Sequence, residues 1–190
     1  MAWKKSSASK IYTEATLYEY AVGALGRRMR TVAELKRLMR TRVSHQPECE
    51  ALVEAVTARL KEQRYLNDTS YAAAYSAYRR DTEKFGRIRI VQDLKAKGVH
   101  PDVINKTVAE VYSEVDEEKL ARDFAARKRL KPPVDQKAAA RIFRMMARAG
   151  FSSRVIVKLL RNWKVEDDTL SALELEREMA EQAPLAEDES

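Results

Sequence analysis

The sequence predicts an all-α protein built from three tandem three-helix repeats in an elongated, modular array. Three observations support this fold class. Apolar residues recur at helical spacing along most of the chain. The 190 residues include only five glycines, five prolines and 7% aromatic residues, so the turn signals that a β-sandwich or barrel needs are scarce. The helical pattern also recurs about every 50 residues, which is typical of a repeat architecture.

The first repeat is predicted over residues 16–66, after a basic N-terminal tail, residues 1–15. The apolar residues of its first helix are Leu17, Tyr20, Ala21 and Ala24. Thr31 and Glu34 match a capping box, which predicts the start of the second helix. A third helix is expected after Gln46-Pro47, and its apolar residues are Leu52, Val53, Val56 and Leu60.

The second repeat is predicted over residues 67–115. The segment Asn67-Asp68-Thr69 can cap its first helix, because short polar side chains accept hydrogen bonds from the first helical turn. A second helix is expected to open after Phe85-Gly86 and to end before Gly98, which suits the left-handed position that follows a helix. Pro101 is expected to start the third helix, because proline fits the first helical turn.

The third repeat is predicted over residues 116–163, and its first helix is expected to end at Pro132-Pro133. Its second helix is expected to stop at Gly150, and Ser152 is expected to cap the third. The second helices of the repeats align at offsets of 56 and 52 residues, which place Gly98 and Gly150 in one slot, where the first repeat has Arg42. Each three-helix unit is too small to bury much surface by itself, so we expect it to pack on its neighbours.

Charge is divided unevenly along the chain. Residues 1–162 hold 34 Lys and Arg against 19 Asp and Glu, whereas residues 163–190 hold two against ten. A basic body favours a polyanionic partner, nucleic acid first of all, although the charge can also serve solubility alone. The acidic C-terminal tail, residues 164–190, is expected to form at most a short docked helix and to be disordered near its end. It either competes with nucleic acid for the third repeat or merely solubilises the protein.

The middle helix of every predicted repeat is basic. In the third repeat the cations are spaced i, i+4, i+7 and i+11, so they form one stripe along a helix. Such a stripe repels itself, and a phosphate backbone would relieve that repulsion; the alternative is a solvated face. The candidate DNA- or filament-binding residues are Lys36, Arg37, Arg40, Arg87, Arg89, Lys95, Lys97, Arg127, Lys128, Arg129, Lys137, Arg141, Arg144 and Arg148.

Two other modes of nucleic-acid binding are less favoured by the sequence. A helix-turn-helix reader of the major groove needs basic or polar residues early in its second helix, but Glu48, Glu50 and Asp102 stand there and would repel DNA. The tyrosines at helical spacing, Tyr71, Tyr75 and Tyr78, can stack on unpaired bases, but we interpret them as core residues.

Neither a catalytic centre nor a metal site is predicted. His45 and Cys49 are four residues apart, but Pro47 lies between them and no second ligand pair accompanies them. The chain has no phosphate-binding Gly-rich loop or nucleophile motif, so we expect no enzyme and no cofactor. A single cysteine and the lack of a secretory signal favour the cytoplasm. No apolar run approaches the roughly 18 residues of a membrane span, so no membrane partner is expected.

A central signature consists of Tyr65-Leu66-Asn67-Asp68, Tyr71-Ala72, Gly86, Arg89-Ile90, Leu94 and Lys97-Gly98-Val99. This signature resembles that of the RecX family, whose members regulate the bacterial recombinase RecA. The chain departs from the family pattern at Asn67 and Val99, and it has Arg64 and Lys84 where the family commonly has glycine. The match covers about residues 65–99, and weaker agreement in helix count extends over about residues 16–163.

The resemblance implies three tandem three-helix units without catalytic residues. It also implies a protein that lodges in the groove of the RecA–DNA filament, binds DNA itself, and inhibits strand exchange and ATP hydrolysis. The expected partners are therefore the RecA nucleoprotein filament and single- and double-stranded DNA, bound by a monomer. Two other classes stay open: a general nucleic-acid-binding helical protein without a recombinase partner, and a helical scaffold whose basic face binds an acidic protein.

Overall fold

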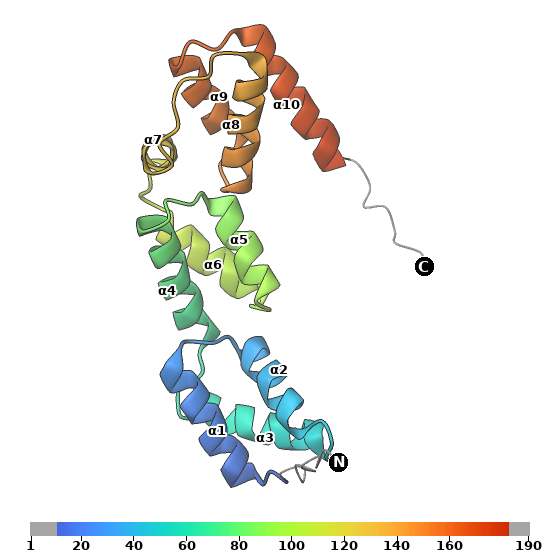
Figure 1. Cartoon of the computed structure of the whole chain (residues 1–190). Helices are drawn as coiled ribbons and strands as arrows, with labels where there is room; N and C mark the ends of the chain where they lie inside the picture. Colours follow the sequence, from blue (N-terminus) through green and yellow to red (C-terminus); the bar gives the residue numbers. More distant parts are fainter. Residues whose placement is uncertain (1–10, 183–190) are drawn as a thin grey trace, which may run out of the picture. The chain divides into compact units, whose positions relative to one another are not determined.

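The computed structural model describes residues 11–182, with side-chain exposure for residues 11–179. Within that range the chain forms ten helices and no strand, so the predicted all-α class is confirmed (Figure 1). The helices are α1 (Glu14–Arg27), α2 (Val32–Val43), α3 (Cys49–Glu62), α4 (Asp68–Asp81), α5 (Arg87–Ala96), α6 (Pro101–Val111), α7 (Glu117–Arg127), α8 (Gln136–Arg148), α9 (Ser153–Asn162) and α10 (Asp167–Gln182).

The helices are distributed over two compact units. Unit 1 contains the chain up to Tyr75 together with Asp93–Thr107, and unit 2 contains Ser76–Gln92 together with the chain from Val108 onward. Helices α4, α5 and α6 therefore each contribute residues to both units. Packing defines these units, whereas the repeat boundaries at residues 16–66, 67–115 and 116–163 stay a prediction from the sequence.

In unit 1, α3 packs against both α1 and α2. The fully buried side chains that join these helices include Leu17, Leu35, Met39, Val53, Val56 and Leu60. The predicted capping box is present: Thr31 accepts from the Glu34 amide at 3.0 Å, and the Glu34 carboxylate accepts from the Thr31 amide at 3.4 Å. The first helix starts before residue 16, because Thr13 and Thr16 form a second capping box.

In unit 2, α9 packs against α7, α8 and α10. Phe124 and Phe151 meet edge to face with ring centroids 5.6 Å apart. Helix α10 is docked on this core, where Leu170 and Leu173 are 1% and 7% exposed. The predicted acidic tail thus contributes a helix over Asp167–Gln182, and the end that was expected to be disordered lies outside the described residues.

The two glycines that were predicted to end middle helices adopt the expected left-handed conformation. Gly98 and Gly150 have φ of 74° and 93°, in the left-handed region that favours glycine. In unit 1, the C-terminus of α5 meets the N-terminus of α2, where the Thr31 hydroxyl donates to the Lys97 carbonyl at 2.7 Å. In unit 2, the C-terminus of α8 meets the N-terminus of α5, where the Gly86 amide donates to the Ala149 carbonyl at 2.9 Å. The same end-to-end junction is therefore built once in each unit.

One predicted helix end and one predicted capping hydrogen bond need correction. Helix α7 ends at Arg127 rather than at Pro132-Pro133, because Arg129 adopts a left-handed conformation and the Leu130 amide donates back to the Ala125 carbonyl at 2.9 Å. Ser152 does occupy the N-cap position of α9, but its side chain makes no capping hydrogen bond. Arg64 and Lys84, which stand where the family commonly has glycine, also have positive φ, of 60° and 59°.

Candidate nucleic-acid interface

Seven of the predicted binding residues line two hollows, one in each compact unit. The first, the α2–α5 hollow, has a volume of about 340 Å³ and lies at the junction of these helices in unit 1. It brings together four of the predicted cations: Arg37, Arg40, Lys95 and Lys97. The other lining residues are Ala33, Glu34, Ala96 and Gly98. Because Glu34 lies among the cations, this hollow is only partly basic.

Lys97 is held inside the α2–α5 hollow by several groups. Its Nζ lies 3.0 Å from Glu34 Oε1, and 5.9 and 5.3 Å from the ring centroids of Tyr71 and Tyr75. Burial acts to lower the pKa of Lys97, but its interactions with Glu34 and Tyr71 outweigh that effect and raise the pKa. Lys97 is therefore a charged group that is already engaged within unit 1.

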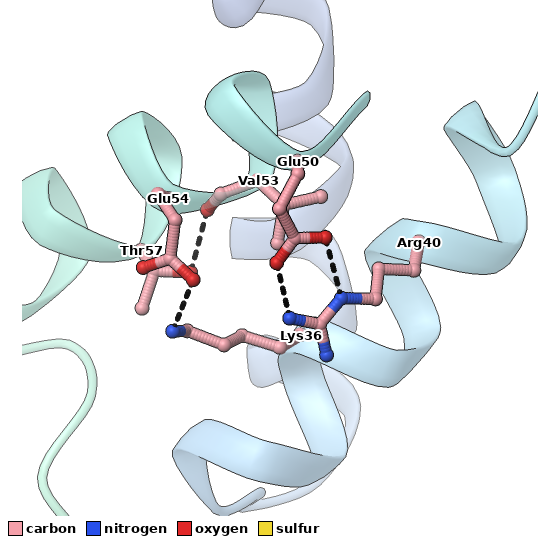
Figure 2. Close-up of polar contacts among 6 residues, drawn as sticks. All are labelled: Lys36, Arg40, Glu50, Val53, Glu54 and Thr57. Carbon is pink, nitrogen blue, oxygen red and sulfur yellow. Dashed lines mark hydrogen bonds and ion pairs between the residues drawn. The ribbon is translucent and has the colours of Figure 1, made fainter. Parts of the chain in front are cut away.

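Other cations on α2 are paired with carboxylates of α3 (Figure 2). The Arg40 guanidinium donates two hydrogen bonds to Glu50, one of them from Nε to Oε2 at 2.9 Å. That hydrogen bond raises the pKa of Arg40 and lowers the pKa of Glu50. Lys36 Nζ donates one hydrogen bond to Glu54 Oε1 at 2.5 Å. The sequence predicted these side chains as phosphate ligands, and the fold gives them acidic neighbours.

The second hollow, the α5–α8 hollow, has a volume of about 350 Å³ and lies within unit 2. It brings together three predicted cations, Arg89, Arg144 and Arg148, and adds Arg177 from the acidic segment. Its remaining lining residues are Gln92, Phe143, Ala147, Leu173 and Glu176. Four arginines thus border a largely apolar floor, with one glutamate among them. Arg177 was not predicted as a binding residue because it is a single arginine among the ten acidic residues of the tail.

The predicted stripe on α8 is exposed along its whole length. The four exposed cations are Lys137, Arg141, Arg144 and Arg148. The opposite face is buried in the core, with Ile142, Phe143 and Met146 at most 4% exposed. Arg144 lies 3.5 Å from Glu176 of α10. Among the described residues 11–182, the other three cations of the stripe have no ion-pair partner.

The remaining predicted cations lie outside both hollows. Arg87 is exposed at the start of α5. Arg127 donates to the Thr82 carbonyl at 2.6 Å and to Glu83 at 3.2 Å, so it holds a turn of unit 2. Lys128 lies over the Phe124 ring at 5.8 Å, and Arg129 is exposed in its left-handed turn.

The tyrosines of α4 do not form a single buried row. Tyr71 is 7% exposed and stacks on Tyr75 with ring centroids 5.9 Å apart, in line with the predicted core role. Tyr78 is 58% exposed, so its predicted place in the core is wrong. Tyr71 and Tyr75 belong to unit 1, whereas Tyr78 belongs to unit 2 and lies outside both core clusters.

A third hollow is lined by residues that are not among the predicted binding residues. It lies in unit 1, has a volume of about 430 Å³, and is named here the Tyr65 pocket. It is lined by Leu25, Met29, Arg30, Arg64, Tyr65, Asn67, Ser70 and Tyr71. These residues come from segments about 35 residues apart in the sequence, so no local pattern brings them together. The family signature did include three of them, Tyr65, Asn67 and Tyr71.

No group of three or more His, Cys, Asp or Glu side chains in residues 11–182 is arranged to hold a metal ion. None of the described helices combines the length and the apolar character needed to cross a bilayer.

Comparisons with known proteins agree with the signature. A family model described as "RecX, second three-helix domain" matches residues 67–108. The regulatory protein RecX of Myxococcus xanthus is 33% identical over 165 residues, covering 80% of this chain and 86% of that protein. The chain belongs to the RecX family. The RecX of Leptothrix cholodnii is 32% identical over 141 residues, covering 74% of this chain and 85% of the relative.

Solved structures of RecX proteins share the fold. One crystal structure of a regulatory protein RecX superposes with a TM-score of 0.63 at 23% identity, covering 78% of this chain and 71% of the other. RecX from Lactobacillus salivarius superposes with a TM-score of 0.59 at 19% identity, covering 85% and 97%. The relatives are named regulatory proteins. One position of the family signature has a structural reason in this chain: a Cβ at Gly86 would lie 2.3 Å from the Gly150 carbonyl oxygen, so only glycine fits there.

Proposed function

We propose that this RecX-family protein regulates the bacterial recombinase RecA by binding the RecA–DNA filament as a cytoplasmic monomer. Binding inhibits the recombinase and ATPase activities of RecA, and the protein itself catalyses nothing. The observation that carries the proposal is the exposed stripe Lys137, Arg141, Arg144 and Arg148 on a helix whose other face is buried. Family membership supplies the partner, and the stripe supplies a surface for the nucleic acid within that partner.

The stripe suits a phosphate backbone for an electrostatic reason. Its four cations lie on one helix face at successive turns, and like charges at this spacing repel one another. Phosphates relieve that repulsion and release the counterions that surround DNA, so affinity falls as salt rises. Contacts of this kind carry no sequence information, which suits a protein that follows a filament along any DNA. Single- and double-stranded DNA are both ligands under this proposal.

The test is a titration of preformed RecA filaments on single-stranded DNA with the full-length protein. RecA turnover of ATP and strand exchange should both fall to a low plateau, while the protein alone hydrolyses no ATP. Unchanged RecA turnover at saturating protein would overturn the proposal. A second arm adds excess free DNA after inhibition. Full recovery of turnover would mean that the protein only sequesters DNA, which is the behaviour of a general nucleic-acid-binding protein; persistent inhibition supports binding to the filament.

A further inference from the structure

The Tyr65 pocket joins two turns of unit 1. One turn follows α1 and contributes Met29 and Arg30, and the other follows α3 and contributes Arg64 and Tyr65. Asn67, just before α4, and Ser70, in the first turn of α4, also line the pocket. The volume of about 430 Å³ lies in the usual range for a small-ligand pocket. None of these residues belongs to the basic stripe or to the two basic hollows.

Tyr65 projects from this pocket on a fixed backbone. Its ring is 59% exposed, whereas the next residue, Leu66, is only 4% exposed and is anchored in the core of unit 1. The Tyr65 amide donates to the Leu60 carbonyl at 3.0 Å, and the left-handed Arg64 turns the chain just before it. The aromatic ring is therefore presented to solvent by a turn whose two flanks are both held.

Asn67 fixes the other side of the turn. Its side-chain oxygen accepts from the amides of Thr69 and Ser70 at 2.9 and 3.1 Å, which caps α4. Met29 is 55% exposed and lines the same pocket as Tyr65. The pocket thus offers an apolar and aromatic platform whose position is set by the fold.

The charge around this platform indicates which kind of ligand it can bind. Two arginines, Arg30 and Arg64, line the pocket, and no acidic residue is among its lining residues. Arg27 and Arg28 are exposed in the same turn as Met29 and add further positive charge. An exposed aromatic ring among cations is the combination that holds unpaired bases by stacking while it attracts the phosphates beside them.

We propose that the Tyr65 pocket receives one unpaired base of single-stranded DNA, with Arg30 and Arg64 facing the adjacent phosphates. The inference rests on the proposed binding of DNA and adds a preference to it. A base inside a duplex is covered on both faces by its neighbours, so it cannot stack on Tyr65. The α8 stripe binds both forms of DNA, and the Tyr65 pocket favours the single strand.

The test measures the affinity of full-length Tyr65→Ala and Tyr65→Phe proteins for a labelled oligothymidylate and for a duplex of equal length. Tyr65→Ala should bind the single strand about 5- to 150-fold more weakly, because that is the range for losing one stacked base. Tyr65→Phe should restore the affinity, and duplex binding should change less than twofold. Tyr78→Ala is the matched control, since Tyr78 is 58% exposed and lines none of the three hollows.

A direct readout accompanies the affinities. Photocrosslinking of an oligonucleotide that carries 5-iodouracil should attach it to Tyr65, because the reaction favours aromatic rings stacked on the base. Equal single-strand affinities of wild type and Tyr65→Ala would overturn the proposal. So would a Tyr65→Ala protein that binds oligothymidylate normally but no longer binds RecA, since the pocket would then hold a protein side chain. Either result leaves the RecA titration intact, so the two proposals fail separately.

Discussion

The α2–α5 and α5–α8 hollows occupy the same place in the repeat frame but differ in how their cations are used. Ala33 and Lys95 in the first stand where Arg89 and Ala147 stand in the second, at offsets of 56 and 52 residues. In the first hollow, Lys97 and Arg40 are paired with Glu34 and Glu50. In the second, an apolar floor is bordered by four arginines. Two cations of the first hollow are thus ion-paired, and in the second hollow Arg144 pairs with Glu176 while Arg177 donates to the Phe151 carbonyl at 3.3 Å. The second hollow differs chiefly in its largely apolar floor.

The helix junctions beside the two hollows differ in the same sense. At the α5–α2 junction of unit 1, a Cβ on Gly98 would lie 2.5 Å from the Cβ of Ala33, a side-chain atom. At the α8–α5 junction of unit 2, a Cβ on Gly150 would lie 2.3 Å from the backbone nitrogen of Arg89. The first approach can be relieved by shortening one side chain, whereas the second joins backbone to backbone. The junction beside the α5–α8 hollow therefore tolerates a side chain at its glycine less well than the junction beside the α2–α5 hollow does.

The largest effect is expected when this junction is altered. Gly150→Ala should lower the free energy of unfolding by about 3 kcal/mol or more, because a backbone clash adds to the strain of an alanine in the left-handed region. Gly98→Ala should cost less, and Ala33→Gly should recover part of that loss. No side-chain truncation can rescue Gly150→Ala. Urea denaturation followed by circular dichroism checks these changes, and equal, rescuable losses at both glycines would remove the distinction between the junctions.

The next effect separates the two basic surfaces by their binding to DNA. Replacing Arg141, Arg144 and Arg148 together with Gln should weaken binding at 0.1 M salt by roughly 100-fold if all three contact phosphates. The slope of log affinity against log salt should become shallower by about 0.7–0.9 for each lost contact. Fluorescence anisotropy at several salt concentrations measures both quantities.

The matched control for that experiment lies on α2. Replacing Lys36, Arg37 and Arg40 together with Gln removes the same charge, but Lys36 and Arg40 are already paired with Glu54 and Glu50. The affinity for DNA should therefore fall less than about fivefold, with a smaller change in slope, because cations that are neutralised internally release fewer counterions from DNA. Equal losses for the two triple variants, with circular dichroism unchanged, would show that the ion pairs do not distinguish the surfaces.

The smallest effect concerns the acidic helix α10, which contributes to the α5–α8 hollow. Glu176 lies 3.5 Å from Arg144, and both side chains are more than half exposed. Glu176→Gln should tighten binding to single-stranded DNA at low salt by up to about fivefold, and the gain should vanish as salt screens the pair. Glu178→Gln is the control, because it removes the same charge from an exposed site of α10. An equal gain for both variants would assign the effect to net charge rather than to competition for Arg144.

Local rules account for most of what the sequence predicted about the fold. Helix periodicity, the Thr31–Glu34 capping box, the Asn67 cap, and the left-handed glycines at positions 98 and 150 depend on residues within a few positions of one another. The same holds for the α8 stripe, whose exposed and buried faces follow from spacing on one helix. The misplaced end of α7 was also a local feature, but Arg129 adopts a conformation that its residue type disfavours, so the prolines were the more visible signal.

The sequence by itself determined the helical class, the family, and which residues are charged on which helix face. Only the tertiary structure decided which carboxylates those charges pair with. The ion pairs are Arg40–Glu50, Arg127–Glu83 and Arg144–Glu176. The tertiary structure also separated Tyr78 from the core and brought Met29 beside Tyr65. The physical reason is range. Helix formation and capping are set by neighbours in sequence, whereas burial, ion pairing and pocket formation depend on contacts between segments that no local pattern connects.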